Sequence, residues 1–219
     1  MAQVRLIIFD LDGTLVDAYE AITKSFNFTM LKTGYPPRSA AAIRRAVGWG
    51  DKNLLAPFVA VHDLDKALAV YRRHHARSLI RYSRLFPSVK RILAGLKERG
   101  LLLAVASNRP TKFSRLLIRH LAIGRYFDYM LCADRLKKGK PDPAILRAIM
   151  TKFRVKPAQT LYVGDMVIDA QAGRRAKVKT VIVTTGSSHA GEIRKQKPWR
   201  IIPRFTGFTK LIGESPRDS

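Results

Sequence analysis

The stretch Leu6-Ile7-Ile8-Phe9-Asp10-Leu11-Asp12-Gly13-Thr14 decides the fold of this chain. Its first four residues are apolar and rich in β-branched and aromatic types, which predicts a short buried strand followed by a turn at Gly13. Asp10 and Asp12 then follow at the carboxyl end of the strand, the end that faces the ligand crevice in open α/β sheets. Because two acids this close repel one another, the junction indicates either a bound cation or a division of acid and base roles.

Further polar segments recur along the chain, and two of them come directly after apolar runs. The runs Leu101–Ala106 and Thr160–Val163 each predict a buried strand. The polar segments are Ser107-Asn108-Arg109-Pro110, Lys140-Pro141-Asp142-Pro143 and Gly164-Asp165, with Asp169 in the residues just beyond. Since parallel strands end at one edge of a sheet, we expect these segments to gather in one pocket with Asp10 and Asp12.

Strand-like runs alternate with helical patterns after residue 86. Apolar residues at helical spacing predict helices around Val89–Leu96, Phe113–Leu121 and Ile145–Met150. Short apolar runs predict additional strands at Tyr129–Cys132 and Thr180–Val183. This alternation predicts an α/β fold, a doubly wound parallel sheet with right-handed crossovers.

Residues 16–85 interrupt this alternation and show helical patterns without a convincing strand. Ser39 is placed to cap a helix over Ala40–Ala46. Two apolar stripes predict longer helices, one formed by Ala18, Ile22, Phe26 and Met30 and the other by Leu68, Tyr71, His75, Leu79 and Tyr82. Stripes of this kind are typical of core faces, so the insertion predicts a helical body that packs its apolar residues inward.

The composition is that of an ordinary globular protein: 219 residues, 47% of them hydrophobic and 26% charged. The only cysteine, Cys132, excludes a disulfide within the chain, and its apolar surroundings predict a buried side chain. No apolar run approaches the ~20 residues that span a bilayer, and the sequence opens without a leader pattern. We therefore expect a cytoplasmic protein without a membrane partner, as a monomer or homodimer.

The charge balance is strongly basic, with 41 Lys and Arg against 16 Asp and Glu and a net charge of +25. Such a field attracts anionic substrates, and it is also typical of nucleic-acid-binding proteins. A ridge of arginines recurs at helical spacing at Arg73, Arg77, Arg81 and Arg84. Basic residues nevertheless occur in every segment and form no basic tail, so nucleic-acid binding is the less favoured interpretation, although the charge does not exclude it.

The segments at Asp10, Ser107, Lys140 and Asp165 resemble, in the same order, the four motifs of the haloacid dehalogenase-like phosphohydrolases. The resemblance covers nearly the whole chain, and from Phe86 to Gly186 it is most similar to the phosphoglycolate phosphatase branch. It implies a Rossmann-like α/β core formed by residues 1–15 and 86–219. It also implies that residues 16–85 form a small α-helical cap over the site.

The resemblance implies phosphoryl transfer through a covalent aspartyl-phosphate. Asp10 is the implied nucleophile, and Asp12 is the implied general acid and then general base. Hard carboxylate oxygens without a nearby His or Cys cluster favour Mg²⁺ as the ion that neutralises the reacting anions. The implied metal residues are Asp10, Asp12 through its main-chain carbonyl, Asp165, and Asp169, which orients waters on the metal or pairs with Lys140.

Five other residues are implied to hold the phosphoryl group and the substrate. Lys140 and Ser107 stabilise charge on the phosphoryl oxygens in this interpretation. A surface lysine and a serine helix cap are the alternatives. We expect Asn108, Arg109 and the glycine-containing cap loop at Gly48 to contact the substrate. Arg109 is suited to a second anionic group on it, and a surface position for Arg109 is nearly as well supported.

The expected function is Mg²⁺-dependent hydrolysis of a small phosphorylated metabolite such as phosphoglycolate, because the loops of a small cap reach only small substrates. A sugar phosphomutase or a pyrophosphatase of the same superfamily is one alternative. A polyanion- or nucleic-acid-binding protein on this scaffold is the other.

Three basic residues flank the cap loop, and surface positions are favoured for them: Arg44, Arg45 and Lys52.

Overall fold

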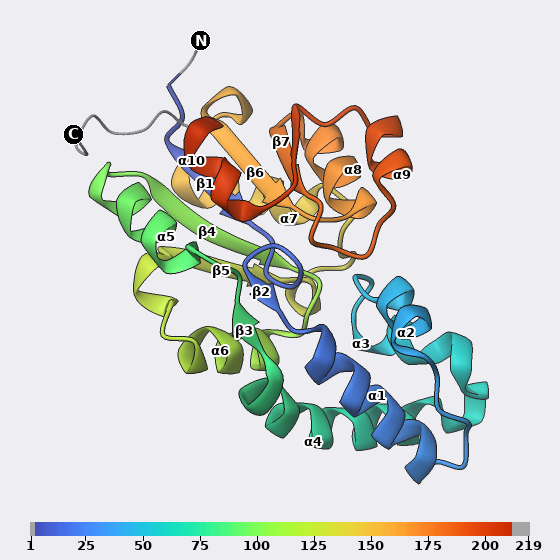
Figure 1. Ribbon diagram of the computed structural model, residues 1–219. Coiled ribbons are helices and arrows are strands. Elements are labelled where there is room, and N and C mark those ends of the chain that lie inside the picture. The colour runs from blue at the N-terminus through green and yellow to red at the C-terminus, as the bar shows by residue number, and fades with distance from the viewer. Residues whose placement is uncertain (1–2, 212–219) are drawn as a thin grey trace.

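The computed structural model describes residues 3–211, and Figure 1 shows a sheet with helices on both faces. Six strands pair in parallel: β1 (Leu6–Phe9), β4 (Leu102–Ser107), β5 (Tyr129–Cys132), β6 (Thr160–Gly164), β7 (Lys179–Val183) and β8 (Arg200–Ile202). Their order across the sheet is β5-β4-β1-β6-β7-β8. The predicted doubly wound α/β fold is confirmed, with β1 at the centre, where the strand order reverses direction.

The core lies on both faces of the sheet, since successive side chains of a strand point to opposite sides. Ile7 and Phe9 pack in one layer, and Leu6 and Ile8 pack in the other. The first layer holds α5 (Val89–Glu98), α6 (Thr111–His120) and α10 (Phe208–Leu211). The second layer holds α7 (Ala144–Phe153) and α8 (Val167–Ala176), with α9 (Ala190–Lys195) packed beside α8.

Four helices gather at one end of the molecule, away from the sheet (Figure 1). They are α1 (Tyr19–Lys32), α2 (Ala40–Ala46), α3 (Asp51–Leu55) and α4 (Leu64–Tyr82). The predicted stripes are buried except for Tyr82, which is partly exposed. The Ser39 hydroxyl accepts a hydrogen bond from the Ala42 N–H at 3.2 Å, so the predicted helix cap is confirmed. All four helices lie within residues 16–85, the segment that the sequence predicts to form a cap.

The expectation that residues 16–85 contain no strand is wrong. β2 (Val16–Asp17) and β3 (Arg84–Leu85) form an antiparallel pair where the chain enters and leaves the helical segment. Two residues are too few to show an alternating pattern, so the sequence carries no readable signal for them. The pair lies close to the predicted boundaries of the cap, and the division into core and cap remains a prediction. Residues 1–2 and 212–219 of the predicted core lie outside the described range.

Two smaller differences concern the sheet. β4 extends to Ser107, one residue beyond the predicted strand, and this places Ser107 at its carboxyl end. β8 was not predicted, because basic residues and prolines surround the short apolar run at Ile201 and Ile202. Cys132 is buried, as predicted.

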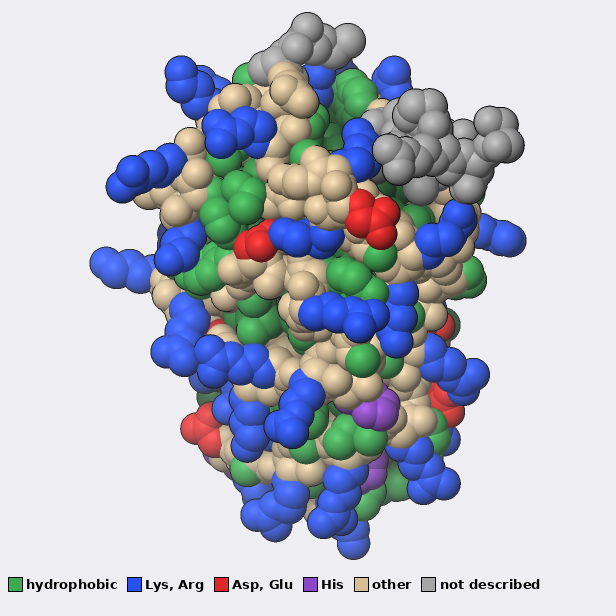
Figure 2. All heavy atoms as spheres, turned by 90° about the vertical axis from the view of Figure 1, so that its left-hand side faces the viewer, with side chains coloured by type: hydrophobic (Ala, Val, Ile, Leu, Met, Phe, Trp, Pro, Cys, Tyr) green, Lys and Arg blue, Asp and Glu red, His purple; other side chains and the backbone are tan. Residues whose placement is uncertain are grey.

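Basic side chains do not gather in one patch on the face that Figure 2 shows. Figure 2 shows Lys and Arg scattered over the visible face. The predicted ridge of arginines is exposed along and just beyond α4, at Arg73, Arg77, Arg81 and Arg84. Within residues 3–211, no helix combines the length and apolar character needed to cross a membrane.

Two helix glycines predict opposite effects of adding a methyl group. Gly95 in α5 has open space around the position of a Cβ atom, so Gly95→Ala should stabilise the protein by about 0.5–1 kcal/mol through helix propensity. In α8, a Cβ atom at Gly173 would overlap the hydroxyl of Thr180 on β7, so Gly173→Ala should cost about 1–3 kcal/mol. Urea unfolding of both variants measures this, and equal effects at the two positions would contradict the packing described.

Candidate active site

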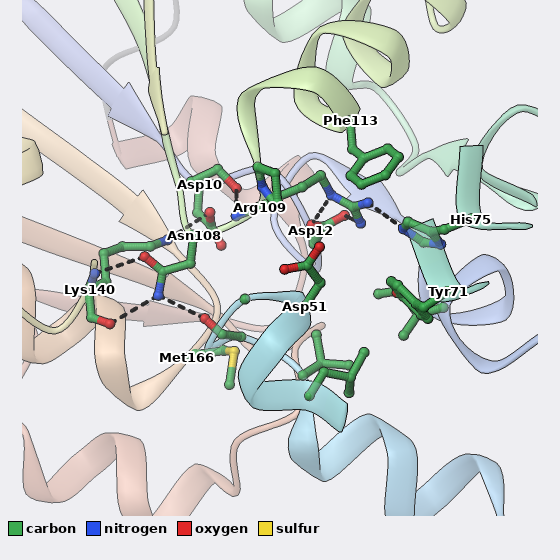
Figure 3. A pocket seen from close by; sticks show the side chains of 17 residues that line it. Asp10, Asp12, Asp51, Tyr71, His75, Asn108, Arg109, Phe113, Lys140 and Met166 are labelled. Carbon is green, nitrogen blue, oxygen red and sulfur yellow. Dashed lines mark hydrogen bonds and ion pairs between the residues drawn. The ribbon is translucent and has the colours of Figure 1, made fainter. Parts of the chain in front are cut away.

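A pocket lies between helices α1, α3 and α4, the loop after α2, and the carboxyl ends of β1 and β4 (Figure 3). It is the crevice that the reversal of strand order creates in a sheet of this type. Seven of the predicted site residues line it: Asp10, Asp12, Gly48, Ser107, Asn108, Arg109 and Lys140. The other two, Asp165 and Asp169, are fully buried, and each has a carboxylate oxygen within 4.8 Å of one of Asp10. The sequence prediction that these segments meet is therefore confirmed.

Lys140 holds the acidic residues together at the floor of the pocket. Its Nζ atom lies 2.7 Å from Asp10 Oδ1 and 2.8 Å from Asp169 Oδ1, and it donates to the Tyr162 hydroxyl at 3.2 Å. These contacts use all three N–H donors of the ammonium group. The alternative interpretation of Lys140 as a surface residue is wrong, because only 3% of it is exposed.

The electrostatics of this cluster show a deficit of positive charge. Burial raises the pKa of Asp10 to about 7, in spite of the opposing effect of Lys140. Burial, together with the charges of Asp10 and Asp169, also raises the pKa of Asp165 well above its usual value. Burial alone would lower the pKa of Lys140, but the carboxylates of Asp10 and Asp169 raise it. One lysine therefore does not balance three buried acids, and a bound cation would lower the cost of ionising them.

The geometry of the three acids fits a metal ion. Asp10, Asp165 and Asp169 each offer a ligand oxygen, and these atoms lie within 4.8 Å of one another. Asp165 Oδ1 accepts a hydrogen bond from the Thr14 hydroxyl at 2.8 Å, whereas its Oδ2 atom is buried without a hydrogen-bond partner. An unpaired buried carboxylate oxygen is costly, and a hard divalent cation would satisfy it.

Asp169 is more fully engaged than the other two acids. Its Oδ1 atom accepts hydrogen bonds from Lys140 Nζ and from the Tyr162 hydroxyl, the latter at 2.6 Å. Its Oδ2 atom accepts from the N–H groups of Asp165 and Met166 at 3.2 and 3.0 Å. The predicted pairing of Asp169 with Lys140 is thus present, and the side chain also fixes the turn that carries Asp165.

Asp12 faces the pocket and is clamped by Arg109. The guanidinium Nε and Nη2 atoms donate to Asp12 Oδ2 and Oδ1, each at 2.7 Å, and Nη1 lies 2.7 Å from His75 Nε2 on α4 (Figure 3). The surface alternative for Arg109 is wrong, because only 8% of the residue is exposed. The clamp joins a carboxylate of the β1 loop to a histidine of the helical segment.

Asn108 and Gly48 connect the loop after α2 to the core. The Asn108 amide donates from Nδ2 to the carbonyls of Gly48 and Lys140 at 2.9 and 3.0 Å, and its Oδ1 atom accepts from Lys140 N–H at 2.8 Å. Gly48 has φ of 114°, and a Cβ atom there would overlap Met166, so glycine is required on both counts. Both residues face the pocket, and their predicted contact with substrate remains a prediction.

Ser107 ends β4, and its Oγ atom accepts a hydrogen bond from the Arg109 N–H at 3.1 Å. The alternative of a helix cap is wrong, because α6 begins later, at Thr111. Since Oγ acts as an acceptor here, its own hydrogen remains available to a ligand oxygen.

Sequence reasoning missed several residues that shape the site. His75 and Tyr162 were hidden inside apolar stretches, where an aromatic side chain reads as core. Arg44 was expected at the surface, yet it is partly buried and donates to the carbonyls of Thr185 and Gly186 at 2.7 and 3.2 Å. No local pattern encodes these contacts. The partners of His75 and Arg44 lie far away in the sequence, and Asp169, which accepts from Tyr162, is seven residues on.

If Asp165 binds a metal ion, Asp165→Asn should stabilise the protein without Mg²⁺ and should remove the further stabilisation that Mg²⁺ gives the wild type. In metal-free buffer the variant should be more stable than the wild type by about 1–3 kcal/mol, because one buried negative charge is removed. Millimolar Mg²⁺ should raise the unfolding temperature of the wild type by mass action and leave that of the variant nearly unchanged. Thermal unfolding in chelator and in Mg²⁺ measures both, and an equal Mg²⁺ shift in the two proteins would rule out Asp165 as a ligand.

His75 predicts a loss of stability in mild acid. Burial and the charge of Arg109 hold its pKa well below the usual value of 6.5. The unfolded chain therefore takes up a proton below about pH 6.5 while the folded protein does not, and the free energy of unfolding falls by up to about 1.4 kcal/mol per pH unit. In urea unfolding between pH 7 and pH 5, His75→Gln should show a shallower decline than the wild type, and parallel declines would contradict a buried neutral histidine.

Comparisons with known proteins agree with this geometry. The family described as haloacid dehalogenase-like hydrolase matches residues 7–183. A phosphoglycolate phosphatase from Pseudomonas putida is 33% identical over 211 residues, which cover 90% of this chain and 76% of that protein. A phosphoglycolate phosphatase from Nitrosococcus oceani is 29% identical, with 98% of this chain and 99% of that protein covered.

A solved structure matches the fold over nearly the whole chain. The crystal structure of a predicted phosphoglycolate phosphatase from Haemophilus somnus superposes with a TM-score of 0.91 at 29% identity. The superposition covers 97% of this chain and 100% of the Haemophilus somnus chain. The family match includes β1 with Asp10 and Asp12, the Lys140 loop and the Asp165 turn. The chain belongs to the haloacid dehalogenase-like hydrolases.

Proposed function

We propose that this protein is a Mg²⁺-dependent phosphatase that hydrolyses a small phosphorylated metabolite, with phosphoglycolate as the first candidate substrate. One observation carries the proposal, namely the surroundings of Asp10 just after the carboxyl end of β1. Asp10 Oδ1 lies 2.7 Å from Lys140 Nζ, and the unpaired Asp165 oxygen belongs to the same cluster. Asp12 lines the same pocket as Asp10. The names of the similar proteins from Pseudomonas putida and Nitrosococcus oceani support the choice of substrate.

In the first step, a carboxylate oxygen of Asp10 attacks phosphorus and forms an aspartyl-phosphate. The bond from phosphorus to the substrate oxygen breaks, and Asp12 gives a proton to the departing alkoxide. Asp12 must enter this step protonated, on an oxygen lone pair that the two hydrogen bonds from Arg109 leave free. Lys140 holds Asp10 Oδ1, so Oδ2 is the freer oxygen for attack. The Ser107 hydroxyl is placed to donate to a phosphoryl oxygen, which stabilises the charge that develops there.

In the second step, water attacks the phosphorus of the aspartyl-phosphate. Asp12, now a carboxylate, takes the proton of this water, and the Asp10–phosphorus linkage breaks to release inorganic phosphate. Asp10 and Asp165, with the main-chain carbonyl of Asp12, would hold Mg²⁺. When bound, the ion supplies positive charge that offsets repulsion between phosphate and carboxylate.

The walls of the pocket favour a small substrate with a second anionic group. Apolar side chains from the helical segment and α6 enclose it: Ile22, Val47, Leu54, Tyr71 and Phe113. Arginine has five N–H donors, and three atoms of the Arg109 group already bond Asp12 and His75. The remaining N–H groups can bind a carboxylate such as that of phosphoglycolate without breaking the clamp on Asp12.

A panel of phosphate monoesters, phosphoglycolate, sugar phosphates and pyrophosphate, with Mg²⁺ or with chelator, tests the proposal. Phosphoglycolate hydrolysis should require Mg²⁺, and Asp10→Asn should lower kcat by about 10³-fold or more, because an amide cannot form the phosphoryl ester. Asp17→Asn changes an exposed aspartate outside the pocket and should retain activity. Turnover of pyrophosphate alone, or sugar phosphate isomers as products, would favour the pyrophosphatase or the phosphomutase.

A further inference from the structure

We propose that His75, on helix α4, is a positioning residue for Asp12 and that it acts through Arg109. The inference rests on the proposed role of Asp12 as general acid and base. It assigns a task in the reaction to a histidine of the helical segment whose side chain need not touch the reacting atoms.

A continuous series of contacts joins His75 to Asp12 (Figure 3). His75 Nε2 lies 2.7 Å from Arg109 Nη1, and the Nε and Nη2 atoms of Arg109 bond the two oxygens of Asp12, each at 2.7 Å. All donors on one edge of the guanidinium are therefore committed to Asp12, while the Nη1 group is fixed from the side of α4. The orientation of the Asp12 carboxylate depends on that of the guanidinium, because both of its oxygens are held.

The direction of each hydrogen bond follows from the chemistry of arginine. A guanidinium has no acceptor atom, so His75 Nε2 must be the unprotonated nitrogen and Nδ1 carries the hydrogen. Nδ1 lies 3.1 Å from Ser25 Oγ, and the Ser25 hydroxyl donates to the Ala21 carbonyl at 2.8 Å. Helix α1 thus sets the tautomer of His75, and this tautomer presents an acceptor to Arg109.

The ring of His75 is also fixed by packing. Tyr71 stacks on it with ring centres 4.7 Å apart, and Phe113 meets it edge-on at 5.4 Å. Only 2% of His75 is exposed. A ring held by two aromatic neighbours and two hydrogen bonds is a rigid support for a buried arginine.

The consequence for the reaction is positional. A general acid must lie within hydrogen-bond reach of the leaving oxygen, and a misplacement of about 1 Å can cost about 10²-fold in rate. Without the acceptor of His75, one Arg109 N–H is left unpaired in a buried site, and the guanidinium is free to turn toward other partners. Asp12 then loses its fixed orientation, although its own side chain is unchanged.

Leaving-group dependence separates positioning of the acid from a general structural effect. Phosphoglycolate expels an alkoxide, which needs a proton from Asp12, whereas p-nitrophenyl phosphate expels a stable phenolate, which does not. His75→Leu should lower kcat/KM for phosphoglycolate by about tenfold or more and for p-nitrophenyl phosphate by less than about threefold. His75→Gln keeps an acceptor near the position of Nε2 and should recover most of the loss.

Two further variants make the test independent of folding. His74→Gln changes the neighbouring histidine on the same helix, which stacks on Phe28 and has no bond to Arg109, so both substrates should be turned over as by the wild type. Ser25→Ala removes the support of the His75 tautomer, together with the contacts of the Ser25 hydroxyl to His74 Nδ1 and the Ala21 carbonyl. It should give a smaller loss with the same substrate preference. Thermal unfolding of every variant shows whether it is folded. If His75→Leu does not fold, the kcat/KM values of Ser25→Ala and His75→Gln for the two substrates test the role of His75.

The outcomes separate this inference from the proposed function. If the wild type hydrolyses phosphoglycolate with Mg²⁺ but the variants lose activity equally toward both substrates, or lose none, the positioning role is overturned and the phosphatase stands. If the wild type hydrolyses neither substrate with Mg²⁺, both proposals fail. A selective loss for phosphoglycolate that His75→Gln restores would support the role of His75.

Discussion

The buried ion pair of Lys140 with Asp10 and Asp169 is the interaction on which the rest of the site depends. Lys140 lies between two acids, 2.7 and 2.8 Å from them, and its third donor reaches Tyr162. Breaking a buried pair by removing one partner is strongly destabilising, because the remaining charge has no compensation. The same lysine does not neutralise Asp165, whose Oδ2 atom is left without a hydrogen-bond partner. The cluster therefore lacks one positive charge, and a divalent ion would supply it.

Much of the core and its acidic cluster could be predicted from the sequence, because the information is local there. Asp10, Ser107 and Asp165 each follow directly after an apolar run, and parallel strands must end at one edge. The sheet order then brings together residues that lie far apart in the chain. Strand β8 and the β2–β3 pair were not predictable in this way, since they are too short to show a period.

The contacts between the helical segment and the core could not be predicted, because they depend on how two packed bodies meet. Arg109 has the same sequence neighbours whether it faces solvent, a substrate or Asp12. His75 fits its apolar stripe, and nothing in that stripe distinguishes a stacked core ring from an acceptor for a guanidinium. The basic surface is a further feature that the fold does not explain. Its charges are scattered over the face seen in Figure 2, which suits attraction of small anions at long range.

If Asp10 carries the phosphoryl group during turnover, as we propose, the group can be trapped on this side chain. Turnover of phosphoglycolate with Mg²⁺ is quenched in acid within milliseconds, the protein is digested, and the peptides are examined by mass spectrometry. A phosphoryl group is expected on the peptide that contains Asp10. It should be absent from the Asp10→Asn variant and from samples quenched without substrate. Active enzyme with no phosphorylated Asp10, or with the phosphoryl group on another residue, would contradict it.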